Sequence, residues 1–434
     1  MRSPVPGALR VFVLSLVLAL GAARSEAAEP FYGVSTVHAT SLRGVTTGRG
    51  VRVAIIDTGI DPTHPALQGA YRGGYDFVHN DMTPDEETAE AHGTMVAGIV
   101  LQVAPDAEIY ALKIFGKENG FDTADLVRAI DWAIAHQIQV INMSFSLKVK
   151  LDDARHALER AEAAGIVAVS ASGNESGPVN YPAAFDTVIA VGAIDRTDTI
   201  ALFSNRGPQV DLAAPGVDIY SLARPGTGIE ARIETESAGV IRATSFGGTR
   251  TGDVTGTLVD CGVGRLDQIP AEVAGNVALF RISPSIDFGT AIGNVFRANA
   301  AAFVIVNSEP RFWYANVNPP GTIPATASIG SDDALRLTPG QTVRVISSVG
   351  DSKFTWGTSC ASPHVAGVVA LLRELAPDAR PSTIRNVLAM SARDAGPTGR
   401  DDEYGAGIVD ALAAARLLAP ERLPQPVRRR AVGR

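Results

Sequence analysis

The chain has 434 residues, of which 46% are hydrophobic and 19% charged, and it carries a formal net charge of -8 at pH 7. This length and composition predict a globular protein with more than one domain. The acidic balance argues against nucleic acid as the main partner.

The N-terminal segment, residues 1–28, has the pattern of a secretory signal peptide. Arg2 and Arg10 precede an apolar run from Val11 to Ala23, and small residues follow. The run is too short to span a membrane, and no later run approaches the necessary length. We expect cleavage between Ala23 and Glu29, and a secreted or periplasmic protein that is not held in a membrane once the signal is removed.

Residues 29–227 alternate between short apolar runs and amphipathic runs. The expected strands are Val51–Asp57, Glu108–Phe115, Val140–Phe145, Ile166–Ser170 and Val188–Ile194. Helical spacing between them predicts helices at Thr123–His136 and Asp152–Ala164. Apolar strands separated by helices predict a three-layer α/β fold with a mainly parallel sheet buried on both faces. The functional site of such a sheet lies beyond the carboxyl ends of its strands.

The composition changes after residue 227, where Gly, Thr, Ser and Pro become more frequent. Short β-like runs occur at Gly256–Val259, Asn276–Phe280, Ala302–Val306 and Thr342–Ile346, with one helix-like segment at Gly289–Ala300. We therefore predict a separate β-rich module at 228–347, inserted into the first domain. The first domain resumes at 348–419, with helices expected at 361–375, 381–391 and 406–418. Residues 420–434 form a basic C-terminal tail, which we expect to be disordered rather than a binding site.

Four polar residues stand at the ends of predicted elements, and each has an ordinary explanation when taken alone. Asp57 ends a strand and could be a turn carboxylate. His92 begins a small-residue helix, a position suited to a general base, although a single histidine is usually structural. Asn174 follows a buried strand; its amide could bind an oxyanion, or the residue could simply occupy a turn.

Ser359 precedes an apolar helix in Gly357-Thr358-Ser359-Cys360-Ala361-Ser362-Pro363. Unpaired N–H groups and the positive end of the helix dipole stabilise negative charge there, which suits a nucleophile. The alternative is that Thr358 or Ser359 only caps the helix. The neighbouring Cys360 and the distant Cys261 could form one disulfide, although Cys360 is more consistent with a small buried residue.

Together, in the order Asp, His, Asn, Ser, these motifs resemble those of the subtilisin-like (subtilase) serine proteases. The resemblance implies that Ser359 is the nucleophile, His92 its general base and Asp57 the residue that orients His92. It also implies that Asn174 and the Ser359 N–H form the oxyanion hole. By the same resemblance, Ser144, Phe145 and Ser146 bind the substrate.

The inserted module resembles a protease-associated (PA) domain in Gly256-Thr257-Leu258-Val259-Asp260-Cys261-Gly262 and Val273-Ala274-Gly275-Asn276-Val277-Ala278-Leu279-Phe280. The family resemblance implies protein or peptide substrates and no cofactor for the chemistry. It leaves the role of the insert open among substrate gating, binding of a partner and spacing. No metal ligand is assigned. The oxygen spacing of Asp76–Asp85 suits a structural calcium ion, although acidic loops are more often merely solvated.

Two alternatives to a serine endopeptidase were weighed. One is a gated or non-catalytic subtilase that acts as a binding protein through its insert, and the intact Asp57, His92, Asn174 and Ser359 weigh against it. The other is an α/β-hydrolase acting on esters, which predicts a Gly-x-Ser-x-Gly motif and the order Ser, Asp, His; the chain has neither.

Overall fold

The computed structural model describes residues 31–88, 90–116 and 120–424. The expected signal peptide and residues 425–434 of the expected tail lie outside the described residues. The described chain contains a seven-stranded sheet in the order β2-β3-β1-β4-β5-β6-β7, and every neighbouring pair runs parallel. Its strands are β1 (Arg52–Asp57), β2 (Tyr71–Asp76), β3 (Glu108–Lys113), β4 (Val140–Met143), β5 (Val167–Ala171), β6 (Val188–Ile194) and β7 (Leu212–Pro215).

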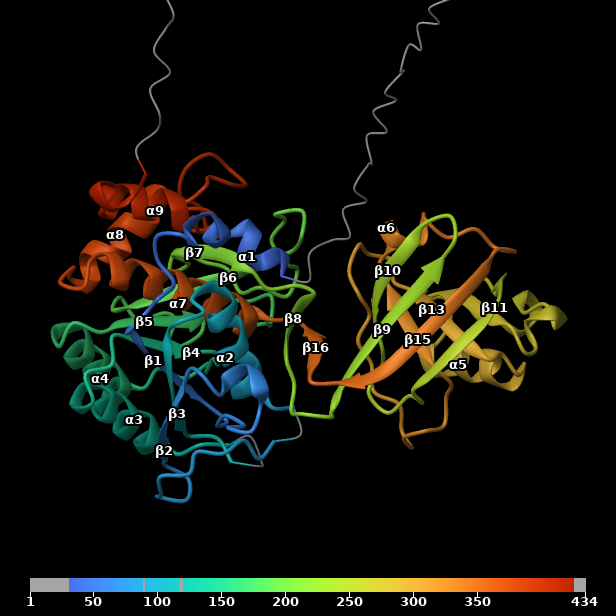
Figure 1. Cartoon of the computed structure of the whole chain (residues 1–434), viewed down its shortest axis with the longest axis horizontal. Coiled ribbons are helices and arrows are strands. Elements are labelled where there is room, and N and C mark those ends of the chain that lie inside the picture. The colour runs from blue at the N-terminus through green and yellow to red at the C-terminus, as the bar shows by residue number, and fades with distance from the viewer. Residues whose placement is uncertain (1–30, 89, 117–119, 425–434) are drawn as a thin grey trace, which may run out of the picture.

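Helices cover both faces of this sheet, as predicted for a three-layer α/β fold (Figure 1). One face carries α2 (His92–Val103) and α7 (Thr358–Leu375), in the same hydrophobic cluster as α8 (Pro381–Ser391) and α9 (Ala411–Leu418); the other carries α3 (Thr123–Ala135) and α4 (Asp152–Ala163). Strand β1 alternates accordingly: Val53 and Ile55 face the first cluster, and Ala54 and Ile56 face the second. Both faces of the strand are therefore buried, which explains its continuous apolar run.

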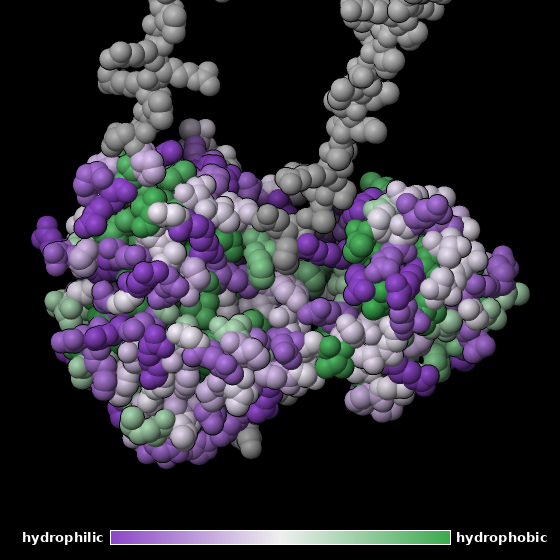
Figure 2. Space-filling model, viewed as in Figure 1, coloured by the Kyte–Doolittle hydropathy of each residue, from purple (hydrophilic) through white to green (hydrophobic). Residues whose placement is uncertain are grey.

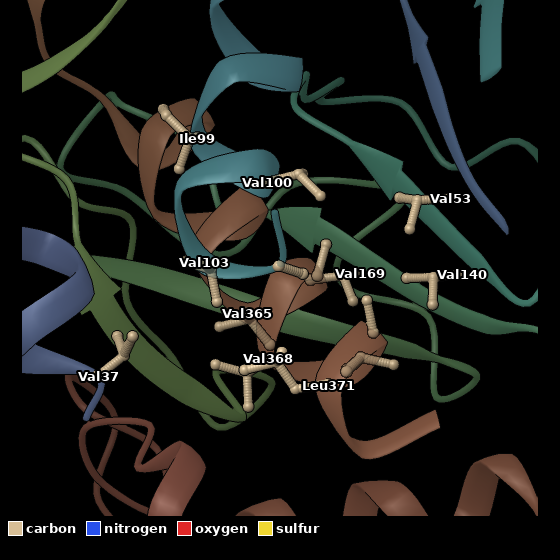
Figure 3. Packing of buried hydrophobic residues seen from close by; sticks show 14 of the residues in the cluster. Val37, Val53, Ile99, Val100, Val103, Val140, Val169, Val365, Val368 and Leu371 are labelled. Carbon is tan, nitrogen blue, oxygen red and sulfur yellow. The ribbon is translucent and has the colours of Figure 1, made fainter. Parts of the chain in front are cut away.

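Helix α7 runs through the centre of the domain. Every one of its residues except Glu374 is buried. Figure 3 shows Val365 and Val368 of α7 packed beside Val100 and Val103 of α2, with the sheet strands next to them. An apolar surface all round the helix is what a core helix requires, and it fixes the position of the residues at its start.

The β-rich segment forms a closed seven-stranded barrel, which we call the barrel and define as residues 228–350 (Figure 1). Its strands are β9 (Gly228–Thr235), β10 (Gly239–Thr244), β11 (Gly252–Asp260), β12 (Val277–Arg281), β13 (Ala302–Val306), β14 (Thr326–Ile329) and β15 (Thr342–Gly350), and its helices are α5 (Phe288–Arg297) and α6 (Ser331–Ala334). The barrel has its own core of Ile, Val, Leu and Ala side chains. Closure of the barrel leaves no free sheet edge.

A short antiparallel pair, which we call the stalk, joins the barrel to the rest of the protein. It consists of β8 (Ile219–Leu222) and β16 (Ser352–Thr355), paired in register from Ser352 opposite Leu222 to Thr355 opposite Ile219. Both connections to the barrel run through this pair, since β8 precedes β9 and β16 follows β15.

Some elements differ from those predicted. Helix α7 begins at Thr358 rather than at 361, because Gly357 adopts φ +130° and serves as the N-cap. Helix α9 begins at Ala411 rather than at 406, because Gly405 and Gly407 have positive φ and the Asp410 side chain accepts a hydrogen bond from the Ala413 N–H. Strand β2 was not predicted: Gly73 and Gly74 interrupt its apolar pattern at a register shift. A short helix, α1 (Tyr32–Thr36), precedes β1.

Polar and charged side chains cover most of the face shown in Figure 2, on both the parallel-sheet domain and the barrel. Within the described ranges, no helix combines the length and apolar character needed to cross a membrane.

Candidate active site

The Asp57 and His92 side chains meet at the carboxyl edge of the sheet. Asp57 is the last residue of β1, and His92 is the first residue of α2. His92 Nδ1 lies 2.7 Å from Asp57 Oδ1, and the carboxylate is 2% exposed. Gly93 permits this approach, because a Cβ there would lie 2.1 Å from the Gly59 carbonyl oxygen. The bond to Asp57 leaves His92 Nε2 as the nitrogen available to a substrate or nucleophile.

Two opposing effects set the pKa of His92. Burial of the ring lowers it, while the charge and hydrogen bond of Asp57 raise it, and the net result is a pKa above the usual value. An imidazolium at this position is therefore stabilised by the carboxylate beside it.

A buried carboxylate behind the pair, Glu86, holds the start of α2 in place. Thr58 Oγ1 donates to Glu86 Oε2 at 2.7 Å and accepts from the Gly93 N–H at 2.9 Å. Glu86 is 3% exposed, and burial together with the charge of Asp57 raises its pKa. This chain of bonds could not be predicted from the sequence, because Glu86 lies in an acidic segment that resembles a solvated loop.

Ser359 occupies the first turn of α7. The residue is 9% exposed, and the head of its helix lies against that of α2, since Cys360 Sγ is 3.9 Å from Met95 Sδ. A Cβ at Gly357 would lie 2.9 Å from Ser359 Oγ and 3.3 Å from Asn174 Nδ2. Glycine at 357 therefore keeps open the space between the serine hydroxyl and the asparagine amide. The N-cap residue is Gly357, not Thr358 or Ser359, so the capping alternative for these two residues is wrong.

The orientation of the Asn174 amide follows from its neighbours. Its Oδ1 accepts from the Thr358 N–H and from Thr358 Oγ1, both at 2.9 Å. A main-chain N–H can only donate, so the oxygen must face Thr358 and the Nδ2 group must face the space beside Ser359. Asn174 Nδ2 and the Ser359 main-chain N–H at the start of α7 are thus donors that face the same space beside Ser359 Oγ.

The three predicted substrate-binding residues follow β4 and have different surroundings. Ser144 is buried; its Oγ donates to the Ser359 carbonyl at 2.9 Å and lies 3.0 Å from Ser362 Oγ. Phe145 packs with Phe115 and Phe121, with ring centroids 5.2 and 5.7 Å apart. The Ser146 Oγ accepts from Asn180 Nδ2 at 3.2 Å. The Ser144 side chain therefore supports the helix of Ser359 from inside.

The loop considered for calcium is neutralised by a lysine. Lys113 lies opposite Asp57 in the register of β1 and β3 and is 1% exposed. Its ammonium contacts Asp76 Oδ2 at 3.1 Å, Glu87 Oε1 at 3.3 Å and the Asp85 carbonyl at 3.0 Å. The Asp76 carboxylate also accepts two backbone N–H groups and contacts the His79 ring. These three oxygens are occupied by an internal cation and are therefore not available as ligands for a calcium ion.

No group of three or more His, Cys, Asp or Glu side chains in the described ranges converges as a metal site. Cys261 and Cys360 are both buried and free, so the open question of a disulfide is answered against it. Burial raises the pKa of the Cys360 thiol to about 12, as expected of a small buried residue.

Residues 48–257 and 342–407, more than half of the chain, match the model of the Subtilase family. The gap between the two matched ranges falls inside the barrel.

The chain is 37% identical over 211 residues to subtilisin E of Bacillus subtilis (strain 168). This match covers 45% of this chain and 55% of subtilisin E. It is 36% identical over 211 residues to subtilisin of Bacillus pumilus, covering 45% of this chain and 76% of that protein. The chain thus spans only about half the length of several relatives that it matches, subtilisin E among them.

Several solved structures resemble nearly the whole chain. Among them is the psychrophilic subtilisin-like protease Apa1 from the Antarctic psychrotroph Pseudoalteromonas sp. AS-11, with a TM-score of 0.72 and 25% identity. The match covers 88% of this chain and 96% of that one.

Proposed function

The chain belongs to the subtilase family, and from this premise we propose that it is a serine endopeptidase that hydrolyses peptide bonds of proteins through an acyl-enzyme on Ser359. The observation that supports this most is the 2.7 Å contact of His92 with Asp57 at the head of α2, beside a serine at the head of α7.

In the first half of the reaction, Ser359 Oγ attacks the carbonyl carbon of the scissile bond while His92 Nε2 takes its proton. Asp57 stabilises the imidazolium that forms. Negative charge develops on the carbonyl oxygen, and Asn174 Nδ2 and the Ser359 N–H are the donors for it. The intermediate then collapses: the C–N bond breaks, His92 gives its proton to the leaving amine, and the acyl group stays on Ser359.

In the second half of the reaction, water takes the role that Ser359 Oγ had in the first half. His92 takes a proton from the water, whose oxygen attacks the ester carbonyl, and the proton returns to Ser359 Oγ as the acid product leaves. No cofactor enters either step.

Labelling with a fluorophosphonate tests this proposal. The wild-type chain should form one adduct at Ser359, and His92→Ala should abolish it. Ser382 offers a matched control, because it is the second residue of α8 as Ser359 is of α7, and it is exposed. Ser382→Ala should label like the wild type. No adduct at Ser359 in the folded protein would favour the alternative, a subtilase that acts as a binding protein through its insert.

We also propose that the segment after β4 binds the substrate, with Phe145 and Ser146 nearest to it and Ser144 acting through its main chain. The buried hydroxyl of Ser144 supports this division. Cleavage profiling with a peptide library should show a preference that changes in Phe145→Ala. An unchanged preference would refute the assignment.

The barrel is proposed to be a PA-like module that binds a protein partner or substrate. Its support is the resemblance of segments 256–262 and 273–280 and its insertion between the two strands of the stalk. For the protein as a whole we propose secretion or export to the periplasm, on the pattern of residues 1–28. N-terminal sequencing of the exported protein should find a start between residues 24 and 29.

A further inference from the structure

The barrel reaches the parallel-sheet domain through the segment Arg311–Val317, which we call the docking segment. This segment is fixed to the barrel by its own main chain: the Trp313 N–H donates to Ser328 Oγ at 3.0 Å, and Gly247 exchanges main-chain hydrogen bonds with Ala315 and Val317. Its position therefore follows the position of the barrel.

Asp218 receives the docking segment on the other side. The residue lies between β7 and β8, has φ +54° and is 2% exposed. Its two carboxylate oxygens each lie 3.2 Å from the Phe312 N–H, and Tyr314 Oη donates to Oδ1 at 2.9 Å. Among the residues that the structure describes, every hydrogen bond donated to this carboxylate comes from the barrel.

An aromatic contact accompanies these bonds. Phe312 is 4% exposed, and its ring packs against Phe354 of β16 with centroids 4.9 Å apart. Phe354 in turn packs against Tyr220 of β8 at 5.0 Å. The docking segment is thus seated on β16, whose Phe354 packs in turn on β8.

Gly216, two positions before Asp218 in the chain, contacts the turn that carries the nucleophile. The Gly216 carbonyl accepts a hydrogen bond from the Gly357 N–H at 2.8 Å, and the Gly216 N–H donates to the Ile194 carbonyl at 2.9 Å. A Cβ at Gly216 would lie 2.8 Å from the Gly357 carbonyl oxygen, so the two turns are packed without room to spare. Gly216 thus links the Asp218 segment to Gly357, which borders the space between Ser359 and Asn174.

We propose that Asp218 is a positioning residue for peptide hydrolysis, which couples the seating of the barrel to the turn at Ser359. The inference rests on the proposed function and adds to it a route by which a protein bound to the barrel changes the reactivity of Ser359. The coupling consists of hydrogen bonds and packed groups on two sides of one segment. The docking segment bonds to Asp218, and the turn at Gly357 bonds to Gly216, two positions earlier in the chain.

Two substitutions test the proposal in the full chain. Tyr314→Phe removes one barrel hydroxyl that bonds to Asp218, and Asp218→Ala removes the acceptor. With a tetrapeptide p-nitroanilide as substrate, kcat should fall about 2- to 30-fold while KM changes little, which is the range for mutations along a coupling route. The double variant should be no slower than Asp218→Ala, because both changes break the same connection.

Tyr220→Phe is the matched control. Tyr220 Oη donates to Glu230 of β9, so it also joins the stalk to the barrel, but not through Asp218. Its kcat should stay close to that of the wild type. Equal losses in Tyr220→Phe and Tyr314→Phe would indicate general loosening of the barrel and would overturn the role of Asp218.

Amide hydrogen exchange over residues 351–366 separates this inference from the proposed function. Exchange there should be faster in Tyr314→Phe than in the wild type, whether or not the wild type cleaves peptides. If the wild type is active and Tyr314→Phe matches it in both kcat and exchange, the coupling does not exist. If Asp218→Ala fails to fold, Tyr314→Phe alone decides.

Discussion

Removal of the Asn174 amide is the most direct test of the oxyanion site. Asn174→Ala deletes the Nδ2 donor that faces the space beside Ser359, and it also deletes the acceptor of two bonds from Thr358. In subtilisin itself, loss of the equivalent donor raises the barrier by about 2.7–4 kcal/mol, a 10²–10³-fold loss in kcat. Because the donor acts on charge that develops only in the transition state, KM should change little.

A second variant separates the donor from its anchor. Thr358→Val removes the hydroxyl bond to Asn174 Oδ1 and the bond that this hydroxyl accepts from the Gly173 N–H at 3.2 Å, and it keeps the main-chain bond to Asn174. A neutral hydrogen bond contributes about 0.5–1.5 kcal/mol. Loss of the hydroxyl bond that orients the Asn174 amide should therefore lower kcat by about 2- to 13-fold, well below the effect of Asn174→Ala.

Steady-state kinetics on a peptide p-nitroanilide provides the measurement, with circular dichroism to verify folding. Asn174 is exposed, so its replacement should leave the fold intact. A loss of less than tenfold in Asn174→Ala would refute the oxyanion role, and an equal loss in Thr358→Val would assign the effect to the turn instead of the amide.

Three further predictions concern charge. Activity requires neutral His92, and its pKa lies above the usual value, so the acid limb of the kcat/KM profile should lie above that value. In Asp57→Asn the carboxylate charge is lost, and the acid limb should therefore move to lower pH. An acid limb that does not move would contradict the assignment of His92 as the base. Lys113→Met leaves Asp76 and Glu87 without their cation, so urea unfolding should show a loss of about 3–5 kcal/mol, and EDTA should leave wild-type stability unchanged. Burial raises the pKa of Asp218 to about 6 from 3.8, and a carboxyl group with a raised folded pKa lowers stability as pH rises between these values. Between pH 5 and pH 7.5, the free energy of unfolding of Asp218→Asn should therefore rise by roughly 1 kcal/mol relative to that of the wild type. A fall relative to the wild type would refute the prediction.

Sequence patterns predicted much of the fold. The strands β1, β3, β4, β5 and β6 are short runs in which apolar residues predominate, and a run of this kind has few alternatives to a buried parallel strand. Helices α3, α4 and α5 were expected close to their observed bounds, since their spacing depends on local sequence. The sequence left a calcium ion at Asp76–Asp85 open and did not reveal the contact of this loop with Lys113, because Lys113 lies on β3 and is distant in sequence.

The sequence by itself determined the family, the order of Asp57, His92, Asn174 and Ser359, and a β-rich insertion. Each of these is recognised from short motifs or from local composition, which depend on residues close together in the chain. Tertiary structure decided which atoms meet: the Asn174 amide turned by Thr358, the hydroxyl of Ser144 turned inward, Glu86 behind Thr58, and Asp218 bonded to Tyr314. These contacts join positions up to 215 residues apart. Local propensity carries no information about such pairs, because their partners come from segments distant in sequence that only the folded chain brings together, where buried polar groups must find hydrogen-bond partners.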